Sequence, residues 1–212
     1  MKKVFIILMI LFTASANAQF KWGLSGGFHS SGLQKRALIS TSRQTNIHVG
    51  LIADYKFSGT GFHILAKVLY APMGYDDSNI EAAGANGNTY GSIESHRIKY
   101  IQIPIYCSFG AKAGKAEIGG GIGPFISFST GDKLKIKGGD TFGNGVMLPV
   151  GTTEINSTVA GFGMHLFSQW KYLMLGFHFH QSLNGIYEGH YPSAKGWKMN
   201  SFGLSLGYFL NQ

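Results

Sequence analysis

Apolar residues alternate with small or polar residues in eight separate stretches of this 212-residue chain. A period of two residues is that of a β-strand with one apolar face. The joints between the stretches are alternately long and very short, and this asymmetry is typical of small membrane-spanning barrels. The stretches lie at about 20–30, 46–57, 62–71, 97–110, 116–128, 153–167, 172–183 and 199–210.

The first residues have the pattern of a secretion signal. Lys2 and Lys3 precede an apolar run at 4–12, and Ala16-Asn17-Ala18 is a small-x-small cleavage site. The apolar run is shorter than the ~20 residues that a membrane-spanning helix needs. We therefore expect cleavage before Gln19, with residues 1–18 as a signal peptide and 19–212 as one domain.

The composition of the non-apolar face indicates which face of the sheet meets water. That face consists mostly of Gly and Ser, with scattered His, Lys, Asp and Glu, and only 13% of the chain is charged. An average soluble domain has about 25% charged residues. A soluble, lipocalin-like barrel would need a charged exterior around an apolar cavity. The sequence instead predicts an all-β fold: a closed eight-stranded antiparallel up-and-down transmembrane β-barrel with a narrow, packed, polar lumen.

Aromatic residues cluster where the predicted strands would cross the two membrane surfaces, as girdles do in such barrels. Tyr70 lies near the ends with long joints. Six others lie near the ends with short joints: Trp22, Tyr55, Phe57, Trp170, Tyr172 and Tyr208. Short joints belong in the periplasm and long ones outside the cell. We expect an integral protein of the outer membrane with both termini in the periplasm.

Two local patterns predict departures from regular strands. Pro104 and Pro124 lie inside strands, where proline removes a ladder donor, and we expect a β-bulge at each. Lys133, Lys135 and Lys137 alternate with apolar residues within 129–152, which predicts a hairpin rising above the membrane.

Four segments resemble an outer-membrane β-barrel domain family widespread in Bacteroidetes, which includes the PorT-like proteins and similar small, OmpX-like barrels. The segments are Leu69-Tyr70 with Met73-Gly74, Tyr100-Ile101-Gln102-Ile103-Pro104, Gly121-Ile122-Gly123-Pro124, and Ser205-Leu206-Gly207-Tyr208-Phe209. The resemblance implies an eight-stranded outer-membrane barrel and, for the PorT-like branch, a link to secretion and gliding machinery. The chain departs from the family in extending past the terminal aromatic by Leu210-Asn211-Gln212.

Charged residues and histidines on the predicted inner face are the candidate site. Asp54, Lys56, Lys67 and Glu117 could form an ion-pair cluster, because charge in a low-dielectric lumen must be paired. The cluster could be structural or could relay protons or ions. The candidate lumen histidines are His29, His48, His178 and His180; His63 and His165 also fall on this face. No carboxylate or thiolate stands at a metal-ligand spacing beside them, so we expect no metal and no cofactor.

Catalytic motifs and partners complete the expectations. No G-x-S-x-G elbow or paired-carboxylate motif occurs, and His180 with Ser182 falls on the inner phase, so we expect a non-enzymatic structural or interaction protein. The alternatives are an outer-membrane lipid-modifying enzyme and a narrow solute channel. The net charge of +8 favours phosphate-bearing lipid or lipopolysaccharide as a neighbour rather than nucleic acid. Further expected partners are the barrel-assembly machinery and an outer-membrane or secretion-system protein.

Overall fold

The computed structural model describes residues 18–34, 42–76, 81–83, 89–137, 154–188 and 197–211. The predicted signal peptide lies outside the described residues except for Ala18. In the part of the chain that is described, no helix is long and apolar enough to cross a membrane.

Twelve strands are described, and all lie in antiparallel pairs. Their bounds are β1 Ala18–Gln34, β2 Ser42–Phe57, β3 Phe62–Tyr70, β4 Met73–Asp76, β5 Glu81–Ala83, β6 Thr89–Ala113, β7 Ala116–Lys137, β8 Glu154–Ile155, β9 Thr158–Trp170, β10 Leu173–Ser182, β11 Tyr187–Glu188 and β12 Lys198–Phe209.

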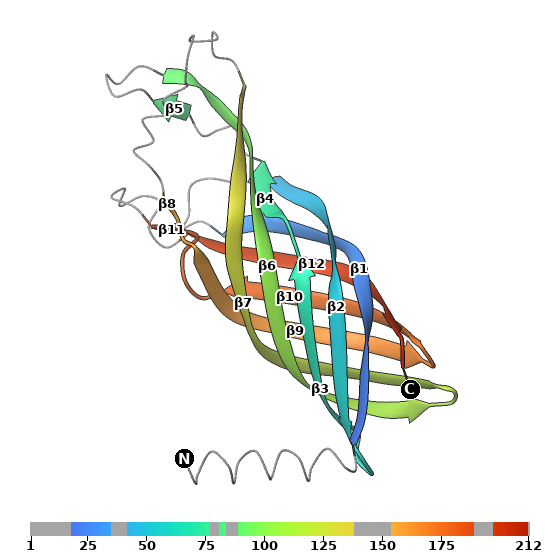
Figure 1. Ribbon diagram of the computed structural model, residues 1–212. Coiled ribbons are helices and arrows are strands. Elements are labelled where there is room, and N and C mark those ends of the chain that lie inside the picture. Colours follow the sequence, from blue (N-terminus) through green and yellow to red (C-terminus); the bar gives the residue numbers. More distant parts are fainter. Residues whose placement is uncertain are drawn as a thin grey trace, which may run out of the picture.

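Eight of these strands close into an antiparallel up-and-down barrel, which confirms this part of the predicted fold class (Figure 1). The order runs β1-β12-β10-β9-β7-β6-β3-β2, and β2 pairs with β1 to complete the cycle. Apart from the closing pair β1–β12, every two adjacent barrel strands also follow one another along the chain, as in an up-and-down barrel. The small strand β4 continues β3 past Ala71 and Pro72 and pairs with both β2 and β6.

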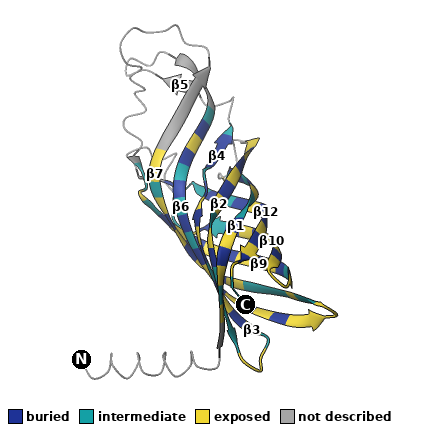
Figure 2. Cartoon of the chain, turned by 45° about the vertical axis from the view of Figure 1, so that its right-hand side comes forward, coloured by how far each residue is buried: buried dark blue, intermediate teal, exposed yellow. Residues whose placement is uncertain are grey.

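The two-residue alternation of the sequence appears as alternating burial along the strands (Figure 2). On β9 the predicted outward residues Phe162, Met164 and Leu166 are 57–58% exposed, while His165 is 1% exposed. The same phase holds on the other barrel strands, so the predicted inner and outer faces are confirmed.

The short joints all lie at one end of the barrel. They are the turn at 58–61 between β2 and β3, the turn at 114–115 between β6 and β7, and the turn at 171–172 between β9 and β10. Strand β1 begins at this end, because Ala18 pairs with Phe57. We call it the turn end, and the opposite end the far end.

Strands β6 and β7 extend together beyond their neighbours at the far end and form a two-stranded ribbon (Figure 1). Ser92 pairs with Lys137 and Arg97 with Lys133. The prediction of a separate hairpin within 129–152 is therefore wrong for residues 129–137: 129–133 pair with the start of the strand predicted at 97–110, and 134–137 pair with 92–96, which was expected to be loop. Residues 138–152 lie outside the described residues. The pairing of β6 with β7 begins at the turn at 114–115 and continues to the far end, with register shifts at Lys99/Tyr100 and Ile93/Ser95.

The predicted bulges at Pro104 and Pro124 are also wrong. The β6–β7 register is the same at Pro104↔Phe125 and at Cys107↔Ile122, and the β7–β9 register passes through Pro124↔Phe162 without a shift. Each proline removes one ladder donor. The sheet accommodates that loss locally, and no extra residue is inserted on either strand.

The lumen is packed but less polar than predicted, because two apolar clusters occupy much of it. The far-end cluster contains Met73, Tyr75, Ile98, Tyr100, Phe125, Val159, Ile186 and Met199. The turn-end cluster contains Ile52, Leu65, Tyr106, Phe167, Met174 and Phe209. Lumen histidines and Lys67 border the second cluster: Lys67 pairs with Ile52, and the ring of His165 stacks on Tyr106 at a centroid distance of 5.1 Å. The cavity among the described far-end residues measures about 10 Å³, which is room for about one water molecule.

Candidate functional site

An ionic cluster closes the lumen at the turn end. Lys56 Nζ on β2 donates to both oxygens of Glu117 on β7, at 2.6 Å each. His63 on β3 lies between two carboxylates, with Nδ1 3.1 Å from Asp54 Oδ1 and Nε2 2.9 Å from Glu117 Oε1. The cluster faces a hollow of about 410 Å³ that Lys56, Lys112 and Glu117 help to line.

Gly110 on β6 allows Glu117 to reach across the barrel. Glu117 belongs to β7, which is separated from β3 by β6. A Cβ atom on Gly110 would lie 2.8 Å from Glu117 Oε1 and 3.0 Å from its Cγ. The carboxylate thus passes over the backbone of β6, and a side chain at position 110 would force Glu117 to shift.

The hydrogen bonds define the charge of the cluster. An ionised carboxylate only accepts, so a histidine between two carboxylates donates from both ring nitrogens and is an imidazolium. Two cations, Lys56 and His63, then balance two anions, Asp54 and Glu117. Asp54 and His63 have side chains 1% and 2% exposed, and this balance is what makes their burial possible. Phe167 packs edge to face with the ring of His63 at a centroid distance of 5.6 Å.

Three of the four residues predicted for the ion-pair cluster therefore meet, but Lys67 does not join them. Its Nζ extends into the lumen and donates to Ser205 Oγ on β12 at 3.3 Å. Its exposed fraction is 3%, and no carboxylate within salt-bridge distance is found for it among the described residues. Position 67 is inward as predicted, but it lies further from the turn end than Asp54 does, and it pairs with Ile52.

The four candidate histidines form a connected layer in the middle of the barrel. Nδ1 of His29 lies 3.2 Å from Nδ1 of His48, and Nε2 of His29 donates to the carbonyl oxygen of Pro72 at 2.7 Å. The ring of His178 lies 5.2 Å from that of His48 and 5.1 Å from that of His180. Tyr106 OH is hydrogen-bonded to His180 Nε2 at 2.5 Å.

Several ring nitrogens of the lumen histidines make no hydrogen bond among the described residues. Both ring nitrogens of His165 and Nε2 of His48 have no hydrogen-bond partner among the described residues. No group of three or more His, Cys, Asp or Glu side chains in the described ranges is placed to hold a metal ion. The layer is thus a set of packed aromatic contacts with two direct links, His29–His48 and Tyr106–His180.

The pair considered for lipid chemistry faces the lumen. Ser182 and His180 are 1% and 3% exposed. Ser182 Oγ accepts a hydrogen bond from the backbone N–H of Met199 at 2.8 Å, and His180 is bonded to Tyr106. Both side chains are therefore used within the barrel and neither reaches its outer wall.

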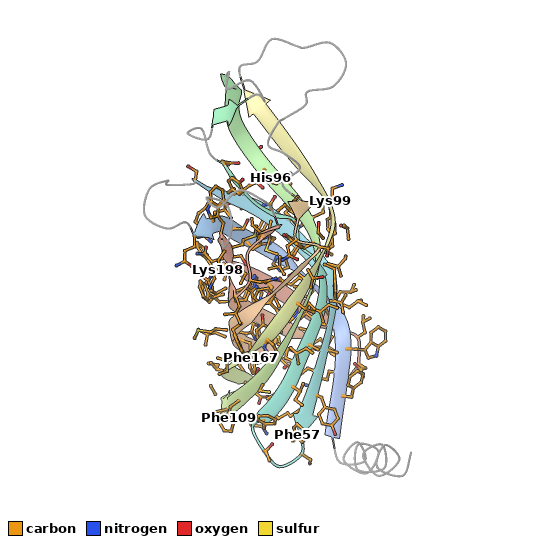
Figure 3. The ribbon with its side chains drawn as sticks, turned by 90° about the vertical axis from the view of Figure 1, so that its left-hand side faces the viewer. Phe57, His96, Lys99, Phe109, Phe167 and Lys198 are labelled. Atoms are coloured by element: carbon orange, nitrogen blue, oxygen red, sulfur yellow. The ribbon has the colours of Figure 1, made fainter. Side chains whose placement is uncertain are left out.

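The predicted girdle residues lie on the outer wall. Trp22, Trp170, Tyr172 and Tyr208 are 41–49% exposed near the turn end, and Tyr70 is 39% exposed towards the far end. Tyr55 and Phe57 are half-buried and pack edge to face, with ring centroids 4.9 Å apart. Figure 3 shows Phe57 and Phe109 near the turn end and Lys99 near the far end.

Sequence reasoning left two residues out of the candidate site, His63 and Tyr106. The signal for His63 was present, since a four-residue turn at 58–61 sets Lys56 opposite His63 and places Asp54 one diagonal step away. Tyr106 gave no such signal, because its hydroxyl bonds a residue on β10, which is not a neighbour of β6.

No protein-family model matches the chain, and no curated protein matches it in sequence. The chain is similar to Ail, the attachment invasion locus protein of Yersinia pestis solved with the heparin analogue sucrose octasulfate. The TM-score is 0.44 and the identity 9%, over 91% of this chain and 99% of Ail.

A second similar structure is the neisserial surface protein A, NspA. The TM-score is 0.45 and the identity 11%, over 90% of this chain and 97% of NspA. Similarity at this level assigns neither a function nor a location to the chain, so both must come from its own residues.

Proposed function

We propose that the protein is an integral outer-membrane β-barrel that acts by binding partners at its surface, without a pore or a catalytic centre. The observation that carries the proposal is a wall of large apolar side chains on the outside of all eight barrel strands. One 45–65% exposed example from each strand is Leu24, Val49, Val68, Phe109, Ile122, Met164, Leu175 and Leu204.

A wall of this kind fits lipid and not water. Soluble monomers rarely expose continuous apolar patches beyond a few hundred Å². A closed barrel satisfies its backbone hydrogen bonds between strands, which is the requirement for crossing a bilayer without helices. The predicted signal peptide and the aromatic girdle support the outer membrane, with the turn end in the periplasm.

The filled lumen favours a surface role over transport. Two apolar clusters and the ionic cluster occupy successive levels of the barrel. An eight-stranded barrel has an interior just wide enough for its own side chains. A planar-bilayer recording is expected to show no discrete conductance, and stepwise currents from the purified protein would contradict this part of the proposal.

The β6–β7 ribbon is the part of the described chain that extends furthest beyond the barrel, and we assign partner binding to it. The resemblance to PorT-like proteins supports a secretion or gliding assembly as the place to look. The test is cross-linking and affinity purification of the tagged protein from native outer membranes, compared with a variant shortened at the ribbon. A stoichiometric protein that is recovered with the full-length chain and lost from the shortened variant is expected. Equal recovery with both would contradict the assignment.

A further inference from the structure

We propose that the lumen of the barrel holds one small inorganic anion, such as chloride, bound by Lys67, His165 and Ser205 over the bare backbone of Gly176. All four positions lie on the inner face, with Lys67 on β3, His165 on β9, Gly176 on β10 and Ser205 on β12. We call them the lumen anion site. The site requires the closed barrel and is independent of the surface role proposed above.

Lys67 is a buried cation that the described side chains do not balance. An ammonium group has three N–H donors, and one of them is used on Ser205 Oγ at 3.3 Å. A hydroxyl carries no charge, and no carboxylate in the described ranges lies within salt-bridge distance of Nζ. A buried charge is costly unless an opposite charge and hydrogen bonds compensate it. The charge of Lys67 and two of its donors are therefore left for another group.

The acids of the turn end do not supply the missing charge. Asp54 lies one diagonal step from Lys67, because it is two residues from the cross-strand partner of that lysine. Both oxygens of Asp54 lie against Nδ1 of His63, at 3.1 and 3.2 Å. Glu117 is bound by Lys56 and His63. Two cations already balance these two anions, so the ionic cluster leaves no negative charge for Lys67.

Two further polar groups meet Lys67 at Gly176. Ser205 is the cross-strand partner of Gly176. A Cβ atom on Gly176 would lie 2.6 Å from His165 Nε2 and 2.9 Å from Ser205 Oγ. Lys67 reaches Ser205 from the opposite wall, because β3 and β10 are four steps apart in the ring of eight strands. An ammonium, an imidazole and a hydroxyl from three strands thus converge where position 176 has no side chain.

His165 offers a donor that is not used elsewhere in the described chain. Its ring is buried and stacks on Tyr106 and Phe167. Neither of its nitrogens has a hydrogen-bond partner among the described residues. A neutral imidazole carries one N–H, and a buried donor without a partner lowers stability. An anion in contact with Nε2–H would satisfy this donor and the charge of Lys67 together.

The donor set favours a monatomic anion. Two side chains already lie within 2.9 Å of one Cβ position at Gly176, so the space suits a single atom rather than a phosphate or a carboxylate. Ser205 Oγ makes only a long contact of 3.5 Å with the carbonyl oxygen of Gly176, and its hydroxyl can turn to an anion instead. A metal cation would be repelled by the ammonium of Lys67.

The test is equilibrium unfolding by urea of the full mature chain in zwitterionic detergent, at constant ionic strength with gluconate in place of chloride. A ligand that binds only the folded state raises the folding equilibrium constant by the factor 1 + [L]/Kd. We expect a rise of roughly tenfold or more between about 1 and about 100 mM chloride. Lys67→Met, which has a similar volume and no charge, should abolish the rise. The matched control is Lys112→Met, at an exposed lysine of the turn end, which should keep it.

A second variant and a bromide measurement locate the ion. The Cβ atom in Gly176→Ala displaces His165 and Ser205, so this variant should need more chloride for the same rise. Crystals of the unaltered protein grown with bromide in place of chloride should show an anomalous scattering peak in contact with Lys67 Nζ, which requires no variant to fold.

Three results would overturn the lumen anion site: no chloride dependence in the unaltered protein, the same dependence in Lys67→Met, or bromide at the protein surface alone, as an adventitious ion only. Any of them would contradict this inference and leave the surface role proposed above standing, since that role is tested by partner recovery.

Discussion

Replacing Asp54 by Asn is the sharpest perturbation of the ionic cluster. The amide keeps the shape of the carboxylate but removes one of two anions that balance Lys56 and His63. The imidazolium of His63 would then keep one carboxylate partner, Glu117, at 2.9 Å. The cluster would carry an excess positive charge behind the side chain of Phe167, 5% exposed.

The expected loss in the free energy of unfolding depends on how deeply each charged group is buried. Removing one partner of a buried ion pair costs about 3–5 kcal/mol. Asp54 and His63 are almost fully buried, but the side chains of Lys56 and Glu117 are 19% and 15% exposed, so water screens part of the excess charge. We expect the free energy of unfolding to fall by about 3 kcal/mol, at the lower end of that range.

The assay is equilibrium unfolding by urea in lipid vesicles, followed by tryptophan fluorescence. The matched control is Asp76→Asn, because Asp76 accepts a neutral hydrogen bond from Gln44 and should cost about 1 kcal/mol. In the double variant Asp54→Asn/His63→Gln the losses should be smaller than additive, since the two residues share one interaction. A loss below about 0.5 kcal/mol for Asp54→Asn would refute the balance of two cations against two anions.

Three further changes test other contacts of the barrel. Gly110→Ala should lower the free energy of unfolding by about 2 kcal/mol in the same assay, because the new Cβ displaces the carboxylate of Glu117; an unchanged midpoint would contradict the close approach. Tyr106→Phe leaves His180 Nε2 without its partner and should cost about 1–2 kcal/mol, measured by the same titration. Asn211→Ala removes two hydrogen bonds to the backbone of β1, at 2.7 and 2.9 Å, and should cost about 1 kcal/mol and speed unfolding at the β1–β12 seam.

The outer face of the barrel could be predicted from sequence because contact with lipid requires an apolar side chain at every outward position. Alternation at Phe162, Met164 and Leu166 fixed the phase of β9 even where its boundaries were several residues off. The inner face carries no such uniform requirement. Ile52 and Phe125 point inward although they are apolar, because packing a narrow lumen needs volume as well as polarity.

The features that could not be predicted from the sequence depend on which strands pair and which side chains meet across the lumen. The alternation at Lys133 and Lys135 was visible, but its partner strand followed only from extending the β6–β7 register past the barrel. Glu117 and His63 are far apart in sequence and belong to strands that are not neighbours. Their contact depends on the bare backbone at Gly110, and a glycine among 31 gives no sign of such a role.

Fluorescence quenching at Cys107 tests the central claim most directly. Cys107 is the single cysteine, and it is exposed in the middle of the outer wall of β6. A fluorophore on Cys107 of the vesicle-reconstituted protein should be quenched by brominated acyl chains and not by iodide in the water. Lys112→Cys in a Cys107→Ser background, at the turn end, should show the reverse. Iodide quenching at Cys107 without quenching by brominated lipid would contradict a membrane-spanning barrel.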